Sequence, residues 1–263
     1  MEVANGDSSS MLGVGMNASL NVLLLSAGVL GFRHGFDYDH IAAITDIAGI
    51  EATPRRTMRL GFMYAIGHAV TVAALGGAVI GFKLALPQGL DRWAEKLVGI
   101  TLMVLAVYVL GTLVRSKGRV RPKSRGSLVM SAVRWGHLRW RRWRTGDAQL
   151  AMGPGREVNG PACFGIGVIH GLGAETPSQI ALFLLASNLG GVSRGLLGLS
   201  VFLVGLVLMN TLMTASAAGL FKAGRGWKGW APVLTGVAAA YSFGIGMVFL
   251  FGYADGLKNI SGS

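Results

Sequence analysis

The sequence predicts an all-α polytopic membrane protein with about six transmembrane helices. Three observations indicate this fold class. Of the 263 residues, 52% are hydrophobic and only 14% are charged, whereas soluble domains carry about a quarter charged residues. The mean hydropathy is +0.53, with the apolar residues gathered into long segments. The chain also has 41 glycines, and small residues let membrane helices approach one another closely.

Six apolar segments account for the predicted helices. They cover residues 19–50, 58–82, 93–114, 161–187, 195–221 and 231–253. Each is long enough to cross a bilayer, which takes about 20 apolar residues in a helix. The first segment is longer than a straight crossing requires, and it contains Gly31, Gly35 and several charged side chains. We therefore expect this segment to tilt, kink or break near those residues.

The basic residues predict the orientation in the membrane. The loops after the first, third and fifth segments hold 18 Lys and Arg residues, and the alternate loops and tails hold five. Since Lys and Arg accumulate in cytoplasmic loops, both termini are predicted to be extracytoplasmic, at a plasma or inner membrane. Topology thus explains the formal net charge of +12, and we expect no nucleic-acid partner.

This topology divides the chain into five parts. They are an extracytoplasmic tail (1–18), a three-helix half (19–114), a basic cytoplasmic loop (115–158), a second three-helix half (159–254) and a C-terminal tail (255–263). The basic loop interleaves tryptophan with arginine, which favours the membrane interface and anionic lipid. Its predicted lipid-interface residues are Trp135, Arg139, Trp140 and Trp143.

Ionisable side chains inside the apolar segments need a reason, because each costs about 2.5–3.5 kcal/mol on insertion scales. Four of the five histidines lie in such segments, in the company of carboxylates. These ionisable residues are Arg33, His34, Asp37, Asp39 and His40 in the first segment, His68 in the second, and His170 and Glu175 in the fourth.

Helix geometry separates the members of the first cluster. On an ideal helix, His34, Asp37 and His40 form a slowly drifting stripe on one face, and Asp39 lies off that stripe. Two arrangements of Asp39 remain open. Either it orients a histidine of a neighbouring helix, or Gly35 opens the helix and brings Asp39 round to the stripe.

The residue types in this cluster suit a transition metal. Imidazole and carboxylate without thiolate are ligands for nickel, cobalt, zinc, manganese or iron, and the single cysteine, Cys163, excludes a thiolate-rich site. Neutral histidine binds a metal through one ring nitrogen, and the other nitrogen usually donates to a carboxylate. Mutual neutralisation of the charges and a proton relay are the alternatives.

The motifs resemble those of the nickel/cobalt permease family. RHGFDYDHIAAITD is similar to the family signature of a histidine, four residues and then Asp-His, and LGFMYAIGHAVTV resembles the next family motif. In this family a further span usually precedes the signature, and we expect this chain to lack it. The resemblance implies that the metal site consists of His34, Asp37, Asp39, His40 and His68.

The second half resembles the family less closely. HGLGAETPSQIALFLL is similar to a Gly-Phe-Asp-Thr-Ala-Thr-Glu-Ile motif, and GLVLMNTLM is similar to a Met-Asp-Thr motif. Gln179 and Asn210 stand where the family motifs have acids, so these motifs have diverged. The residues implied for a second-half pathway are His170, Glu175, Thr176, Gln179 and Asn210.

The two halves resemble each other weakly. GFRHGFDYD and GVIHGLGAE each place glycine next to histidine, with an acid five residues after that histidine. Internal repeats are common in transporters, whose binding sites lie at the repeat interface near the middle of the membrane. We therefore expect two weakly repeated three-helix halves around one site.

The sequence predicts a permease that takes up a divalent transition metal, with Ni²⁺ or Co²⁺ as substrate and no organic cofactor. There is no GxxxxGK[ST] nucleotide-binding motif. One alternative, suggested by Gln179 and Asn210, is a divalent-metal exporter or non-nickel transporter on the same scaffold. Another is an intramembrane metalloenzyme, but the chain has no HExxH motif, and we expect no enzyme activity.

Overall fold

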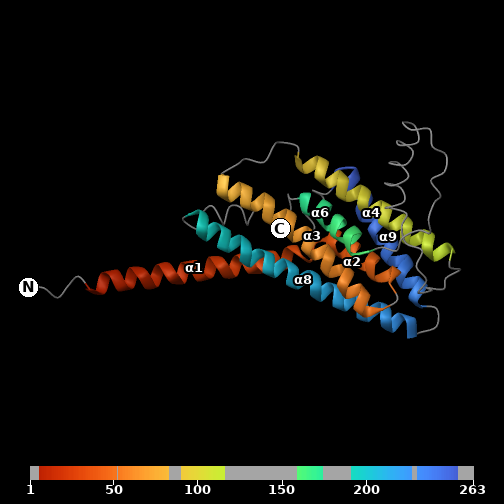
Figure 1. The fold of residues 1–263 in the computed structure, drawn as a ribbon, viewed down its shortest axis with the longest axis horizontal. Coiled ribbons are helices and arrows are strands. Elements are labelled where there is room, and N and C mark those ends of the chain that lie inside the picture. The colour runs from red at the N-terminus through yellow and green to blue at the C-terminus, as the bar shows by residue number, and fades with distance from the viewer. Residues whose placement is uncertain are drawn as a thin grey trace, which may run out of the picture.

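The computed structural model is all-helical, as predicted, and it describes residues 6–51, 53–82, 90–115, 159–173, 191–226 and 230–253. These ranges contain helices and turns but no strand. The helices are α1 (Gly6–His34), α2 (Tyr38–Ile50), α3 (Pro54–Phe82), α4 (Leu90–Arg115), α6 (Gly160–Leu172), α8 (Val192–Gly226) and α9 (Trp230–Leu250). They form a bundle beyond which the N-terminal part of α1 extends (Figure 1).

Four of these helices are long and apolar enough to cross a membrane. They are α3, most of α4 (Arg92–Val114), α8 and α9. Two shorter apolar helices lie at Leu20–His34 and Gly160–Leu172. The prediction of six transmembrane helices is therefore confirmed only in part. The first predicted segment is divided between α1 and α2, and only the start of the fourth lies within the described residues.

The chain leaves the helical conformation between His34 and Tyr38. The amide of Phe36 donates to Arg33 O (2.9 Å) and that of Asp37 to His34 O (3.1 Å), and Asp37 has extended dihedrals, φ −68° and ψ 158°. A break near Gly35 was one of the predicted outcomes. Consequently the stripe predicted on one continuous helix is wrong, because the two histidines belong to separate helices.

Helix α6 has clear start and stop signals. The Asn159 side chain accepts a hydrogen bond from the amide of Ala162 (3.1 Å), and Pro161 occupies the first turn, both of which favour helix initiation. At the other end, the Gly173 amide donates to His170 O (3.1 Å). Histidine 170 therefore lies in the last turn, as His34 does in α1.

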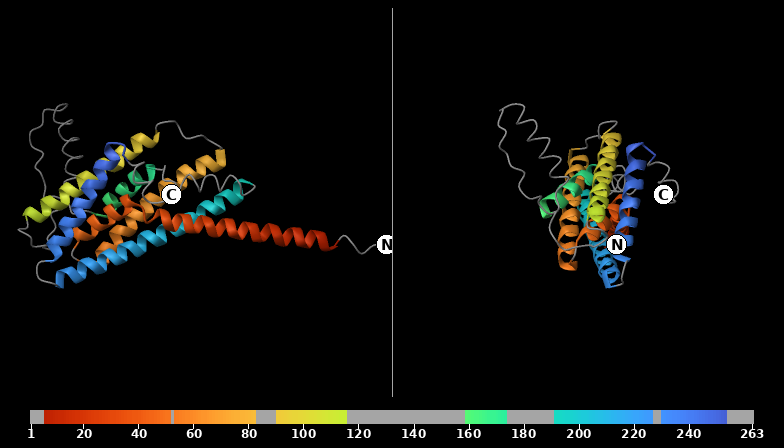
Figure 2. Two further views of the ribbon diagram at one scale, coloured as in Figure 1. Left: turned by 180° about the vertical axis from the view of Figure 1, so that it is seen from behind. Right: turned by 90° about the vertical axis from the view of Figure 1, so that its right-hand side faces the viewer.

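Glycines bring three pairs of helices into close contact. At Gly67 of α3, an added Cβ would overlap the carbonyl oxygen of Phe164 in α6, and at Gly167 it would overlap that of Tyr64. The α1–α8 and α4–α9 pairs meet in the same way, for example at Gly31 and Gly99. The end-on view in Figure 2 shows the helices running side by side. The glycines at these contacts thus serve packing, as expected for membrane helices.

One end of the bundle is held by polar contacts around Glu51, which follows α2. The Arg56 side chain, near the start of α3, lies 3.2 Å from the Glu51 carboxylate. Arg225, near the end of α8, donates to Glu51 O (3.0 Å). The end of α2, the start of α3 and the end of α8 therefore lie at the same end of the bundle.

Candidate metal centre

Three buried histidines meet where α1, α2 and α3 come together. His34 ends α1, His40 lies in the first turn of α2, and His68 lies in the middle of α3. Their exposed fractions are 2%, 0% and 1%. One ligand atom from each ring lies within 4.8 Å of the other two. We call this set the histidine cluster.

Asp37 orients the first of these rings. Its carboxylate oxygen lies 2.9 Å from His34 Nδ1, and because a carboxylate accepts, Nδ1 donates and leaves a lone pair on Nε2. His34 Nε2 lies 3.1 Å from His68 Nε2. Two nitrogens bound at about 2.0–2.1 Å to one ion lie roughly 3 Å apart. The pair is therefore spaced to share a metal ion.

Buried ring nitrogens without hydrogen-bond partners complete the cluster. The Tyr64 hydroxyl lies 3.3 Å from His40 Nδ1, whereas His40 Nε2 and His68 Nδ1 have no hydrogen-bond partner among the described residues. Buried polar atoms are normally hydrogen-bonded. An atom left without a partner beside other imidazoles is available to bind a ligand.

A second polar group adjoins the cluster through Tyr64. The Tyr64 hydroxyl lies 3.0 Å from His170 Nδ1 of α6, and the Asp39 carboxylate lies 3.8 Å from that same nitrogen. Thr101 Oγ1 of α4 lies 3.1 Å from His170 Nε2. Asp39 therefore approaches a histidine of a neighbouring helix, which was one of the two arrangements left open, and it lies outside the histidine cluster.

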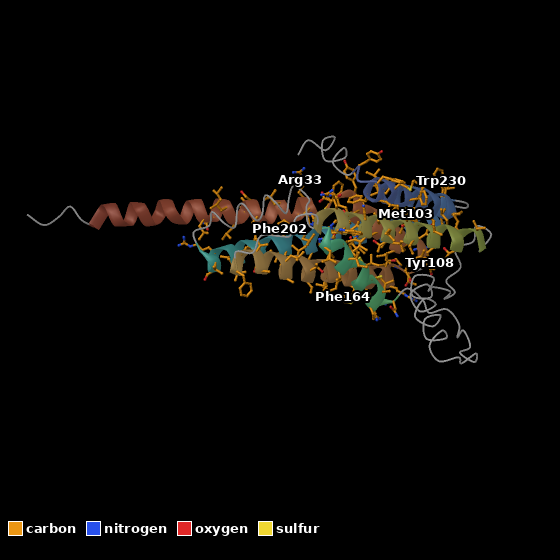
Figure 3. All side chains as sticks on the ribbon, turned by 90° about the horizontal axis from the view of Figure 1, so that it is seen from above. Arg33, Met103, Tyr108, Phe164, Phe202 and Trp230 are labelled. Carbon is orange, nitrogen blue, oxygen red and sulfur yellow. The ribbon has the colours of Figure 1, made fainter. Side chains whose placement is uncertain are left out.

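The remaining predicted residues are only partly placed by the structure. Asn210 of α8 is fully buried and lies beside His40, and its amide atoms lack hydrogen-bond partners within the described residues. Arg33 is exposed, and Figure 3 labels it at the C-terminal end of α1, with Phe202 on α8 nearby. The predicted residues outside the described ranges are Glu175, Thr176, Gln179, Trp135, Arg139, Trp140 and Trp143.

The sequence analysis overlooked three polar residues, of which two are buried and the third, Thr101, is partly buried. Tyr64 precedes His68 by four residues, a spacing that puts two side chains on one helix face, so it could have been found. Asp46 is a third aspartate in the first apolar segment. Placing an aspartate inside a membrane helix is costly, and this cost could have drawn attention to it. Nothing in the sequence pointed to Thr101, because threonines are common in these segments. Only the tertiary structure brings it to His170.

Comparison with known proteins identifies relatives of one kind. Residues 20–121 match the family of the high-affinity nickel-transport protein. The chain is 30% identical over 216 residues to the cobalt transport protein NhlF of Rhodococcus rhodochrous, covering 75% of this chain and 58% of that protein. It is 24% identical to the nickel transporter NicT of Mycobacterium tuberculosis, covering 87% of this chain and 66% of that protein.

A third relative is the high-affinity nickel-transport protein NixA of Helicobacter pylori, 26% identical over 77% of this chain and 65% of that protein. The chain spans less than two thirds of the length of each of these three relatives. No solved structure matches it. The comparisons confirm the resemblance that the sequence motifs indicated, at modest identity.

Proposed function

Because this chain is a homologue of nickel and cobalt transporters, we propose that it is a membrane permease for a divalent transition-metal cation, with nickel or cobalt as substrate. The observation that carries this proposal is the histidine cluster, three buried imidazoles from three helices with ligand atoms within 4.8 Å of one another. Imidazole nitrogens suit nickel and cobalt.

The proposed ligands are His34, His40 and His68. Asp37 acts on the metal through His34, whose tautomer it sets by accepting from Nδ1. Asp37 is 29% exposed, so its carboxylate is also placed to attract an incoming cation. Mixed imidazole and carboxylate surroundings hold an ion weakly enough to release it, which transport requires.

We assign the second polar group to the next step of the path. Asp39 orients His170, and His170 receives the cation as it leaves the histidine cluster. The 3.8 Å separation of Asp39 and His170 supports this assignment. Asn210, beside His40, would line the same path. Glu175, Thr176 and Gln179 continue it in the second half.

The helix ends favour a cation over an anion. Helices α1 and α6 both end within a few residues of the polar groups, with His34 and His170 in their last turns. The C-terminal end of a helix carries a partial negative charge. Transporters with broken helices use such ends to coordinate cations near the middle of the membrane.

The proposed arrangement has six crossings in two related halves (19–114 and 159–254). The first crossing is the broken pair α1–α2, and the fourth begins with the short helix α6. The basic loop (115–158) is cytoplasmic, with Trp135, Arg139, Trp140 and Trp143 at the lipid interface, and the tails (1–18 and 255–263) are extracytoplasmic. The contacts of Glu51 with Arg56 and Arg225 support one shared side for two basic loops.

Uptake is the proposed direction of transport. A resting membrane potential favours inward movement of cations by about 2.3 kcal/mol per charge per 100 mV. Export on the same scaffold remains the second candidate, because Asn210 and Gln179 replace acids of the family motifs.

The test is metal binding and uptake by the purified protein in proteoliposomes. We expect His34→Ala and His68→Ala to abolish both nickel binding and nickel uptake. His137→Ala, in the basic loop and without acidic neighbours in sequence, is the matched control and keeps both. Unchanged nickel uptake in His34→Ala and His68→Ala would refute the assignment of the histidine cluster as the metal site. Accumulation in the opposite direction would refute uptake and leave the site intact.

A further inference from the structure

Asp46 is a buried carboxyl group that the histidine cluster does not use. It lies in α2, and its exposed fraction is 0%. Neither carboxylate oxygen has a hydrogen-bond partner among the described residues. The Ser242 hydroxyl of α9 lies beside it but donates to the carbonyl oxygen of Ala42 instead (3.2 Å). The carboxyl group therefore lacks the partner that burial normally demands.

The helix facing Asp46 offers no charge to balance it. Helix α9 contains no charged residue. Its titratable side chain is Tyr241, which is partly buried and donates to Tyr38 O (3.5 Å). Helix α4 carries its charged residues near its two ends, and Tyr108 is the titratable side chain in its middle.

The other two helices that pack on α2 give the same result. Helix α8 has no charged residue between Arg194 and Lys222, near its ends. On α3, Arg56 pairs with Glu51 (3.2 Å), whereas Arg55 and Arg59 are exposed. The titratable groups deeper in α3 are Tyr64 and His68, which belong to the polar groups already described.

An ionised carboxylate buried without a partner is costly, so such a group keeps a proton or binds another cation. The surroundings favour a proton. Ala42 and Ala43 of α2 and Ala238 of α9 belong to one buried apolar cluster. The Ser242 and Thr235 hydroxyls already donate to backbone carbonyl oxygens. A larger cation would need several further oxygen ligands, whereas a proton needs only the carboxylate.

The position of Asp46 links this proton to the metal. Six residues separate it from His40, or about 9 Å along the helix axis, and it lies on the side of His40 toward Glu51. Charges at such a distance in a poorly solvated interior still interact. A divalent cation at the histidine cluster therefore favours loss of the Asp46 proton, and the proton in turn disfavours the bound cation.

We propose that Asp46 is the proton-binding carboxyl through which the permease exchanges protons for the divalent cation. When the cation occupies the histidine cluster, the O–H bond of Asp46 breaks and the proton passes to water. When the cation has left, the carboxylate takes a proton again. This inference rests on the proposed function, since it assigns the coupling ion of that transport.

The experiment uses proteoliposomes that hold a pH-sensitive dye and report nickel uptake at the same time. With the unaltered protein, nickel added outside causes protons to leave the vesicles, and an acidic interior accelerates uptake. Asp46→Asn abolishes the proton flux and the acceleration. It keeps nickel-for-nickel exchange, and its nickel affinity depends less on pH than that of the unaltered protein, because an amide has no proton to lose when the cation binds.

Two variants control for unspecific damage. Glu51→Gln makes the same carboxyl-to-amide change beside the same helix, at a carboxylate paired with Arg56, and it keeps the proton flux. Asp46→Glu keeps a titratable group and retains part of that flux. Difference infrared spectroscopy adds an independent readout: nickel binding removes a carboxylic-acid C=O band that is absent from Asp46→Asn.

The outcomes separate this inference from the proposed function. Three results with the unaltered protein would each overturn the role of Asp46. Nickel uptake could be independent of the pH gradient, protons could move in the same direction as the metal, or a sodium gradient could accelerate nickel uptake. An unchanged proton flux in Asp46→Asn would overturn that role as well. Absence of both uptake and nickel-for-nickel exchange in the unaltered protein would instead refute the transport function itself.

Discussion

At the scale of single residues, the chemistry of the centre depends on which ring nitrogen each histidine presents. Asp37 settles this for His34 by accepting from Nδ1. Tyr64 plays the corresponding part for His40. The Tyr64 hydroxyl lies 3.3 Å from His40 Nδ1, and His40 Nε2 has no hydrogen-bond partner among the described residues. Such outer partners fix ring orientation and strengthen metal binding.

Tyr64→Phe tests this role. The substitution removes only the hydroxyl, which joins His40 to His170, so we expect nickel affinity to fall by about tenfold or more while the protein still folds. Tyr241→Phe removes a hydroxyl that bonds to the backbone at Tyr38, and it serves as the control with wild-type affinity. Calorimetric titration of the purified variants measures both, and equal affinities would contradict the assignment to Tyr64.

At the scale of elements, the centre depends on one break and one close helix pair. The break after His34 lets two histidines reach the same point from different helices, and an added Cβ at Gly35 would lie 2.8 Å from Met209 Cβ of α8. The α3–α6 pair brings Tyr64 to His170 (3.0 Å). That approach requires glycine at Gly67 and Gly167, where a Cβ would overlap backbone oxygen atoms.

Gly167→Ala therefore separates α3 from α6. We expect a loss of stability of about 1–3 kcal/mol, as for other overpacking substitutions, together with weaker nickel binding. Gly77→Ala is the matched control on α3, because a Cβ there meets nothing within 4 Å. Its stability stays the same or rises slightly, since alanine favours helix. Thermal unfolding in detergent measures both, and equal melting temperatures would argue against the close pair.

At the scale of the whole molecule, charge and helix breaks act together. Arg56 and Arg225, from two of the basic stretches, both contact Glu51 at one end of the bundle. The two short apolar helices each place a histidine in their last turn. Both features fit the proposed arrangement, in which one polar centre lies inside the bundle and the basic end is expected to face the cytoplasm.

Cysteine labelling tests this orientation. The native Cys163 is buried and can be replaced by serine to give a background without cysteine. In that background we expect a membrane-impermeant maleimide to label Ser261→Cys in intact cells. It should label Ser124→Cys, in the basic loop, only after the cells are opened. The reverse pattern would overturn the predicted topology and leave the histidine cluster unaffected.

The sequence by itself determined the all-helical membrane class and the family resemblance, because apolar segments and short motifs are local features of the chain. It also singled out His34, His40 and His68 as ionisable residues where lipid should exclude them. The stripe of His34, Asp37 and His40 on one continuous helix was wrong, since helix periodicity alone does not show where a helix breaks.

Only the tertiary structure decided which polar groups meet. It brought His170, Thr101 and Asp39 together from three helices, and it left Asp46 without a hydrogen-bond partner among the described residues. These outcomes depend on how closely helices approach and which faces they present. Both are set by long-range packing, which no local pattern encodes.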